Sequence, residues 1–116
     1  MTRWSSKKII EWYSEQEWLI GSNFLPSTAI NQLEMFQNET FDEKTIRKEL
    51  GLAKSLGFNS MRVYIHDLLW EIKDEFLINF EKFLSICKER NIKPIIVLFY
   101  DCHRSNPKLC TQNLPL

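Results

Sequence analysis

At 116 residues the chain has room for one domain at most, and its 15 basic and 15 acidic side chains give a net charge of zero. The basic residues are scattered and form no stripe, which argues against nucleic acid as a partner. The longest apolar run, residues 95–100, is far too short to span a bilayer, so no membrane partner is predicted.

Targeting and redox signals indicate the cytoplasm. The first eight residues carry positive charges, but no apolar stretch follows them, so no secretory signal is visible. The three cysteines are odd in number and lack CxxC spacing, which favours reduced thiols over a disulfide framework. We therefore predict a cytoplasmic protein, and nothing in the sequence indicates a cofactor.

The first third of the chain predicts a helix, a strand and a long loop. Apolar residues recur at helical spacing over residues 5–13, behind a serine that can cap the helix. The compact apolar stretch over residues 18–24 predicts a buried strand, with Trp18 in the core and close backbone packing at Gly21. A polar loop over residues 24–40 is longer than usual, and such loops tend to carry function.

A second helix and a second strand follow the loop. The helix is predicted to begin at Thr40 or Asp42, since either can cap it, and to end at Gly57. Residues 60–66 alternate apolar with polar side chains, which predicts a strand with two chemically different faces.

A further helix over residues 74–90 and an apolar strand over residues 94–100 complete two strand-helix-strand crossovers. Such crossovers predict a parallel sheet and an α/β fold. The strand spacing suits part of an α/β barrel, and a doubly wound sheet fits the same order. No strand is followed by GxGxxG or GxxxxGK[ST], which argues against a nucleotide-binding version.

In both folds ligands bind at the carboxyl ends of strands. Arg62 is the most informative residue there, because a guanidinium inside an alternating strand needs an acceptor within the fold. A structural ion pair or an edge position explains it equally well. Phe36 and Tyr100 are candidate stacking platforms for sugar rings, although aromatic residues also fill cores.

Metal and nucleophile chemistry are weak alternatives. His66 and Asp67, near residues 101–103, offer imidazole, carboxylate and thiolate ligands, but the spacing matches no metal motif, and we expect no metal site. Cys102 and His103 are adjacent on a strand end, so they point to opposite faces and make a poor nucleophile pair.

Four stretches together resemble a family of β/α-barrel glycoside hydrolases described as cellulase-like or xylanase-like. They are GSNFLPSTAINQLEMFQ (21–37), ETFD (39–42), SLGFNSMRVYIHDL (55–68) and IKPIIVLF (92–99). The resemblance covers nearly the whole chain. It implies that residues 1–116 are the N-terminal portion of a (β/α)8 TIM barrel, truncated after its third strand.

The resemblance also implies a chemistry and a set of contacts. Relatives of this kind are retaining hydrolases that act on β-linked poly- or oligosaccharides with two carboxyl groups about 5–5.5 Å apart. Those groups lie on strands four and seven, so no catalytic residue is assigned here and the chain alone is expected to be inactive. The substrate contacts that the match implies, or that strand-end position adds, are Asn23, Glu34, Phe36, Arg62, His66, Asp67 and Tyr100.

Two alternatives stay open. The chain can be a small non-catalytic carbohydrate-binding or interaction module, or an unrelated small α/β domain that associates through its open sheet. For a barrel truncated after its third strand, the unsealed edge at that strand predicts that the isolated chain self-associates, aggregates or remains partly molten, because the edge exposes backbone donors that a complete barrel would pair.

Overall fold

The computed structural model describes residues 1–100 and 107–110. The sequence interpretations that concern residues 101–103 therefore lie outside the described residues. The elements follow the chain in the order α1 (Ser6–Ser14), β1 (Gly21–Asn23), α2 (Gln32–Phe36), α3 (Glu43–Ser55), β2 (Ser60–Tyr64), the 3₁₀ helix η1 (Asp67–Ile72), α4 (Lys73–Glu89) and β3 (Lys93–Val97).

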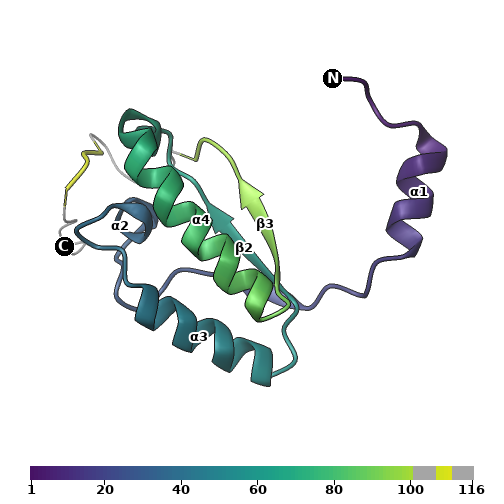
Figure 1. Ribbon diagram of the computed structural model, residues 1–116, viewed down its shortest axis with the longest axis horizontal. Coiled ribbons are helices and arrows are strands. Elements are labelled where there is room, and N and C mark those ends of the chain that lie inside the picture. Colours follow the sequence, from purple (N-terminus) through teal and green to yellow (C-terminus); the bar gives the residue numbers. More distant parts are fainter. Residues whose placement is uncertain (101–106, 111–116) are drawn as a thin grey trace.

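The three strands form one open parallel sheet in the order β1-β2-β3. Asn23 of β1 lies opposite Arg62 of β2, which lies opposite Ile95 of β3. Helices α3 and α4 run side by side over one face of this sheet (Figure 1). The predicted α/β class and parallel sheet are confirmed.

One hydrophobic core fills the space between the sheet and the two helices. Along β2 the side chains of Met61 and Val63 are buried, whereas Arg62 between them is exposed. The buried pair meets Ile46 of α3 and Phe83 of α4 in the same cluster. The alternation of residues 60–66 therefore sorts one apolar face toward the helices and one polar face away from them.

The start and end of α3 follow from local chemistry. Asp42, and not Thr40, caps the helix, because its carboxylate accepts the backbone N–H and the hydroxyl of Thr45 at 3.0 and 2.7 Å. These bonds, the backbone one foremost, hold the pKa of the Asp42 carboxyl below its usual range. Gly57 follows the helix with φ of 93°, which confirms the predicted glycine stop.

The predicted strand over residues 18–24 is corrected in extent and burial. Only Gly21–Asn23 forms β1, and Trp18 is 82% exposed instead of lying in the core. The reason is that none of the helices described in residues 1–100 packs on residues 15–20, which lead away from the sheet to α1. The close approach at Gly21 is confirmed, because a Cβ built there would lie 1.9 Å from the carbonyl oxygen of Ser60.

The long loop contains an element that the sequence interpretation missed. Helix α2 lies within residues 24–40, is capped by Asn31, and has four of its five residues buried. The apolar residues of this segment therefore serve the core. Within residues 1–100 and 107–110, no helix is both long and apolar enough to cross a bilayer.

Cys87 on α4 gives a direct test of this packing. Its side chain is buried, and burial raises the pKa of the thiol to about 12. Because the thiolate is the reactive form, we expect iodoacetamide at pH 8 to leave Cys87 unmodified in the folded chain and to alkylate it in denaturant. Exposed Cys110 is the internal control. Peptide mass mapping that finds both cysteines alkylated equally fast without denaturant would contradict the placement of α4.

Candidate functional site

Four side chains gather where β1 and β2 end, on the face of the sheet that the helices leave bare. They are Asn23 from the end of β1, Arg62 and Tyr64 from β2, and Tyr100 from the segment after β3. We call them the polar-aromatic cluster. Their position matches the carboxyl ends of parallel strands, where ligands bind in α/β folds.

Arg62 is held in place by its neighbour on β1. Its Nε donates to Oδ1 of Asn23 at 2.7 Å, and its guanidinium carbon lies 5.3 Å from the centre of the Tyr64 ring. Both contacts follow from register, because Asn23 and Arg62 are paired across the strands and Tyr64 is two residues further along the same face. The hydrogen bond to Asn23 uses Nε only, and the Arg62 side chain is exposed. The two terminal guanidinium nitrogens can therefore donate to a ligand.

The two tyrosines form the aromatic part of the cluster. Their ring centres are 4.6 Å apart, with the planes inclined by 47°. Tyr100 is brought back over β2 because its backbone N–H donates to the carbonyl of Ile65 at 2.9 Å, just after Phe99 turns the chain with φ of 56°. A hollow of about 380 Å³ adjoins the rings, and α2 contributes Gln32 and Met35 to its wall.

Two of the residues predicted to contact substrate lie elsewhere, in the segment that holds α2. Phe36 has no solvent exposure and packs edge-on against Phe76, Phe80 and Phe83. It belongs to the core, and the expectation of a sugar-stacking platform is corrected, because no face of the ring can be reached from solvent. The sequence could not show this, since an aromatic residue in a polar loop fits both situations.

Glu34 is likewise turned into the protein. Its side chain is buried, and Oε2 accepts the backbone N–H of Ile30 at 2.7 Å. The carboxylate therefore braces the turn that leads into α2. In this position Glu34 supports the loop beside the cluster instead of joining it.

His66 and Asp67 begin η1 after β2. Oδ1 of Asp67 lies 2.8 Å from Nδ1 of His66 and accepts the backbone N–H of Leu68 at 2.9 Å. The His66 side chain is mostly buried, whereas Asp67 is about half exposed. The pair therefore shapes the chain at the strand end, and only Asp67 offers its carboxylate to solvent.

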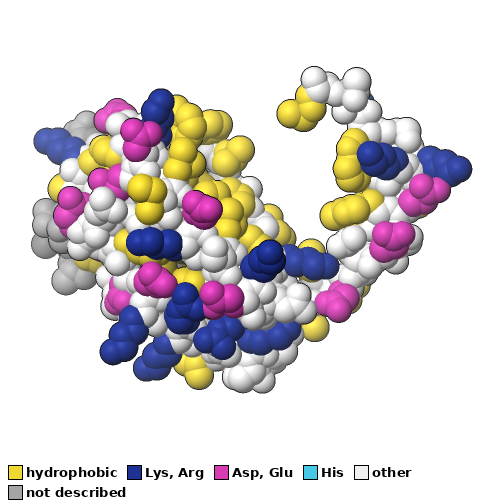
Figure 2. Space-filling model, viewed as in Figure 1, with side chains coloured by type: hydrophobic (Ala, Val, Ile, Leu, Met, Phe, Trp, Pro, Cys, Tyr) yellow, Lys and Arg dark blue, Asp and Glu magenta, His cyan; other side chains and the backbone are white. Residues whose placement is uncertain are grey.

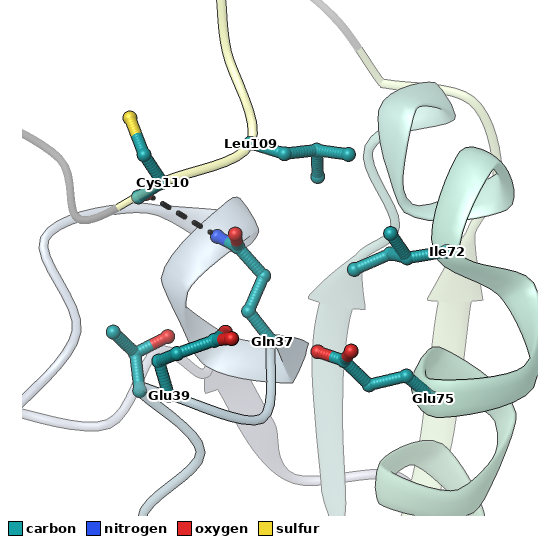
Figure 3. Close-up of a pocket in the computed structure, with 7 residues that line it drawn as sticks. Gln37, Glu39, Ile72, Glu75, Leu109 and Cys110 are labelled. Atoms are coloured by element: carbon teal, nitrogen blue, oxygen red, sulfur yellow. Dashed lines mark hydrogen bonds between the residues drawn. The ribbon is translucent and has the colours of Figure 1, made fainter.

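A second hollow lies on another part of the molecule (Figure 3). It is lined by Gln37, Glu39 and Thr40 after α2, by Ile72 at the end of η1, by Glu75 in the first turn of α4, and by Leu109 and Cys110. Gln37 donates through Nε2 to the Cys110 carbonyl at 3.4 Å, and Glu75 accepts the backbone N–H of Asn38. These contacts fasten the segment after α2 to α4, so this hollow has a structural explanation.

The cluster combines one guanidinium, one amide and two phenol rings. Such a set binds hydroxyl-rich ligands through hydrogen bonds and ring stacking, but it contains no carboxylic acid to donate a proton and no carboxylate to attack a carbon. Among the described residues, no group of three His, Cys, Asp or Glu side chains is placed to hold a metal ion.

The sequence predicted that Asn23, Arg62 and Tyr100 lie together at the strand ends, as the structure shows, but Tyr64 was not among the predicted contacts. The sequence did contain a sign of this position, because Tyr64 follows Arg62 by two residues and therefore lies on the same polar face of the strand. The α2 residues that line the hollow gave no comparable signal.

Comparison with known proteins adds nothing to this geometry. No family model matches the chain, and no curated protein or solved structure is significantly similar to it.

Proposed function

We propose that this chain forms the first three strands of a cellulase-like or xylanase-like β/α-barrel glycoside hydrolase, and that its polar-aromatic cluster contacts a β-linked poly- or oligosaccharide. The observation that carries the proposal is the Asn23–Arg62 hydrogen bond beside the contacting rings of Tyr64 and Tyr100, at the carboxyl ends of parallel strands. The sequence resemblance adds the chemistry, since it implies a sugar contact at Asn23 and, at Arg62, an active-site arginine that orients the nucleophilic carboxylate beside the substrate.

The winding of the chain supports a barrel over a doubly wound sheet. The strand order follows the chain order, and α3 and α4 cover the same face of the sheet (Figure 1). A doubly wound fold reverses strand order at its switch point and places helices on both faces. In a barrel the helices lie outside, so the bare face that carries Arg62 and Tyr64 corresponds to the interior.

The cluster suits a sugar in two ways. Sugar hydroxyls accept hydrogen bonds from a guanidinium, and such bonds to a charged group contribute about 1.5–3 kcal/mol each. The apolar face of a pyranose ring packs on an aromatic ring, as Tyr64 and Tyr100 allow. Nothing in the cluster can act as the acid or the nucleophile of hydrolysis, so the proposed role of this chain is binding without turnover.

Titration calorimetry with cellohexaose and xylohexaose tests the binding. We expect Arg62→Ala to weaken binding about tenfold, because losing one hydrogen bond to a charged group removes at least 1.4 kcal/mol. Arg47→Ala is the matched control, since Arg47 pairs with Glu43 and Glu89 on α3 and α4, away from the bare face. Equal affinities for the two variants, or no binding by the unaltered chain, would refute the assignment of the cluster.

An assay on aryl glycosides, β-1,4-glucan and xylan tests the second half of the proposal. The chain alone should give no turnover above background, because the cluster lacks both carboxyl groups that cleavage needs. Turnover that Arg62→Ala abolishes would mean that a catalytic pair exists within these residues.

A further inference from the structure

The hollow beside the two tyrosines has a wall that the polar-aromatic cluster does not supply. Its volume is about 380 Å³, near the lower end of the range of about 300–1,000 Å³ for small-molecule sites, so it suits a ligand as small as one sugar ring. We call it the tyrosine hollow. Its described lining residues are Asn23, Phe24, Leu25, Gln32, Met35, Tyr64 and Tyr100.

The polar side chains in and around α2 differ in whether the protein itself uses them. Asn31 caps the helix, Glu34 accepts a backbone N–H, and Gln37 donates to a backbone carbonyl. Gln32 is half-buried and lines the tyrosine hollow, and within residues 1–100 and 107–110 its amide has no hydrogen-bond partner. Gln32 is therefore the side chain of this segment whose amide is left for a ligand.

The tyrosine hollow combines this amide with a second one and with apolar surface. Asn23 is oriented by the bond from Arg62 to its Oδ1, which leaves its NH₂ group to donate elsewhere. Phe24 and Met35 supply apolar lining and are only 9% and 1% exposed. Polar groups beside apolar and aromatic side chains match a pyranose ring, which has hydroxyls at its edge and an apolar face.

The charge of the lining narrows the class of ligand. The described side chains that line the tyrosine hollow are all uncharged at neutral pH. Figure 2 shows, by contrast, Lys, Arg, Asp and Glu side chains spread over α3 and α4. A carboxylate placed in the hollow would lose water without meeting an opposite charge in this lining, which costs free energy. The lining therefore favours a neutral sugar over a sugar acid.

We propose that the tyrosine hollow seats one uncharged sugar ring, and that Gln32 binds two neighbouring hydroxyls of that ring. An amide offers an NH₂ donor and a carbonyl acceptor side by side, and each sugar hydroxyl can both donate and accept, so one glutamine can serve two hydroxyls. This inference rests on the proposed function, because it places one unit of the same oligosaccharide. It adds a contact from α2 to those that the strands supply.

Gln32→Met tests the contact by titration calorimetry with cellohexaose. Methionine keeps the length and helix propensity of glutamine and removes the amide, so binding should weaken about three- to tenfold. Gln16→Met is the matched control, since Gln16 is also half-buried but bonds to Lys93, away from the hollow. If Gln32→Met binds like the control while Arg62→Ala binds more weakly, the role of Gln32 is overturned and the proposed function stands. No binding by the unaltered chain would refute both.

The side-chain NH₂ signals of Gln32 report the contact directly in nuclear magnetic resonance spectra. Assigned by their loss in Gln32→Met, they should shift in a saturable manner when methyl β-glucoside is added, while those of Gln16 stay in place. Methyl β-glucuronide, which carries a carboxylate in place of the hydroxymethyl group, should bind at least about tenfold more weakly. Unmoved Gln32 signals while the Tyr64 amide shifts would overturn the contact, and equal binding of the glucuronide would overturn the neutral subsite.

Discussion

Replacing Phe36 with alanine should lower the free energy of unfolding by about 3–5 kcal/mol, the usual cost of emptying a buried phenylalanine site. Phe36 has no solvent exposure, and its ring centre lies 5.6, 5.7 and 5.8 Å from those of Phe76, Phe80 and Phe83. The free energy of unfolding of such domains is only about 5–15 kcal/mol, so the variant should lose a large part of its stability. Chemical denaturation followed by circular dichroism measures the change.

Phe99→Ala is the control for that experiment. Phe99 is the same residue type but 70% exposed, and its replacement should change stability by no more than about 0.5 kcal/mol. If both variants were equally stable, Phe36 would not be a core residue, and its role as a sugar platform would have to be reconsidered.

Replacing Gly21 with alanine should disrupt the pairing of β1 with β2 and cost at least about 3 kcal/mol, the upper part of the range for overpacking. The added Cβ would lie 1.9 Å from the Ser60 carbonyl oxygen, a backbone atom that cannot move without breaking the sheet. The same loss should displace Asn23 and free Arg62 from its hydrogen bond, so sugar binding should fall together with stability.

Gly51→Ala gives the opposite sign within the same chain. Gly51 lies inside α3, and a Cβ there would meet only the Arg90 guanidinium at 3.5 Å, an ordinary contact. Alanine in a helix interior is favoured over glycine by about 0.5–1 kcal/mol, so this variant should be slightly more stable. Thermal unfolding of both variants checks the pair, and a Gly21→Ala chain as stable as Gly51→Ala would show that β1 does not lie against Ser60.

The elements that were predictable are those whose signal is local. Gly57 ends α3 because only glycine adopts positive φ without cost, and the alternation of side chains around Arg62 predicts which face of β2 is buried. The proximity of Asn23, Arg62 and Tyr100 followed from the rule that parallel strands end at one edge.

What was not predictable depends on long-range packing. Trp18 was expected in the core because tryptophan usually is, yet it lies on a segment that none of the described helices covers. Helix α2 is only five residues long, which is too short for a periodic pattern, and its burial depends on α4 across the sequence. Glu34 and Phe36 were misread for the same reason, since a residue in a polar loop carries no mark of the partner it will meet.

Chemical shift mapping by nuclear magnetic resonance, with cellohexaose and xylohexaose added to the isotope-labelled chain, tests the central claim most directly. The account predicts that the amide signals of Asn23, Arg62, Tyr64 and Tyr100 shift together in a saturable manner, while those of α3 and α4 stay in place. Shifts confined to the helices, or no shift at the cluster with either sugar, would contradict the assignment of the bare sheet face as a carbohydrate-binding surface.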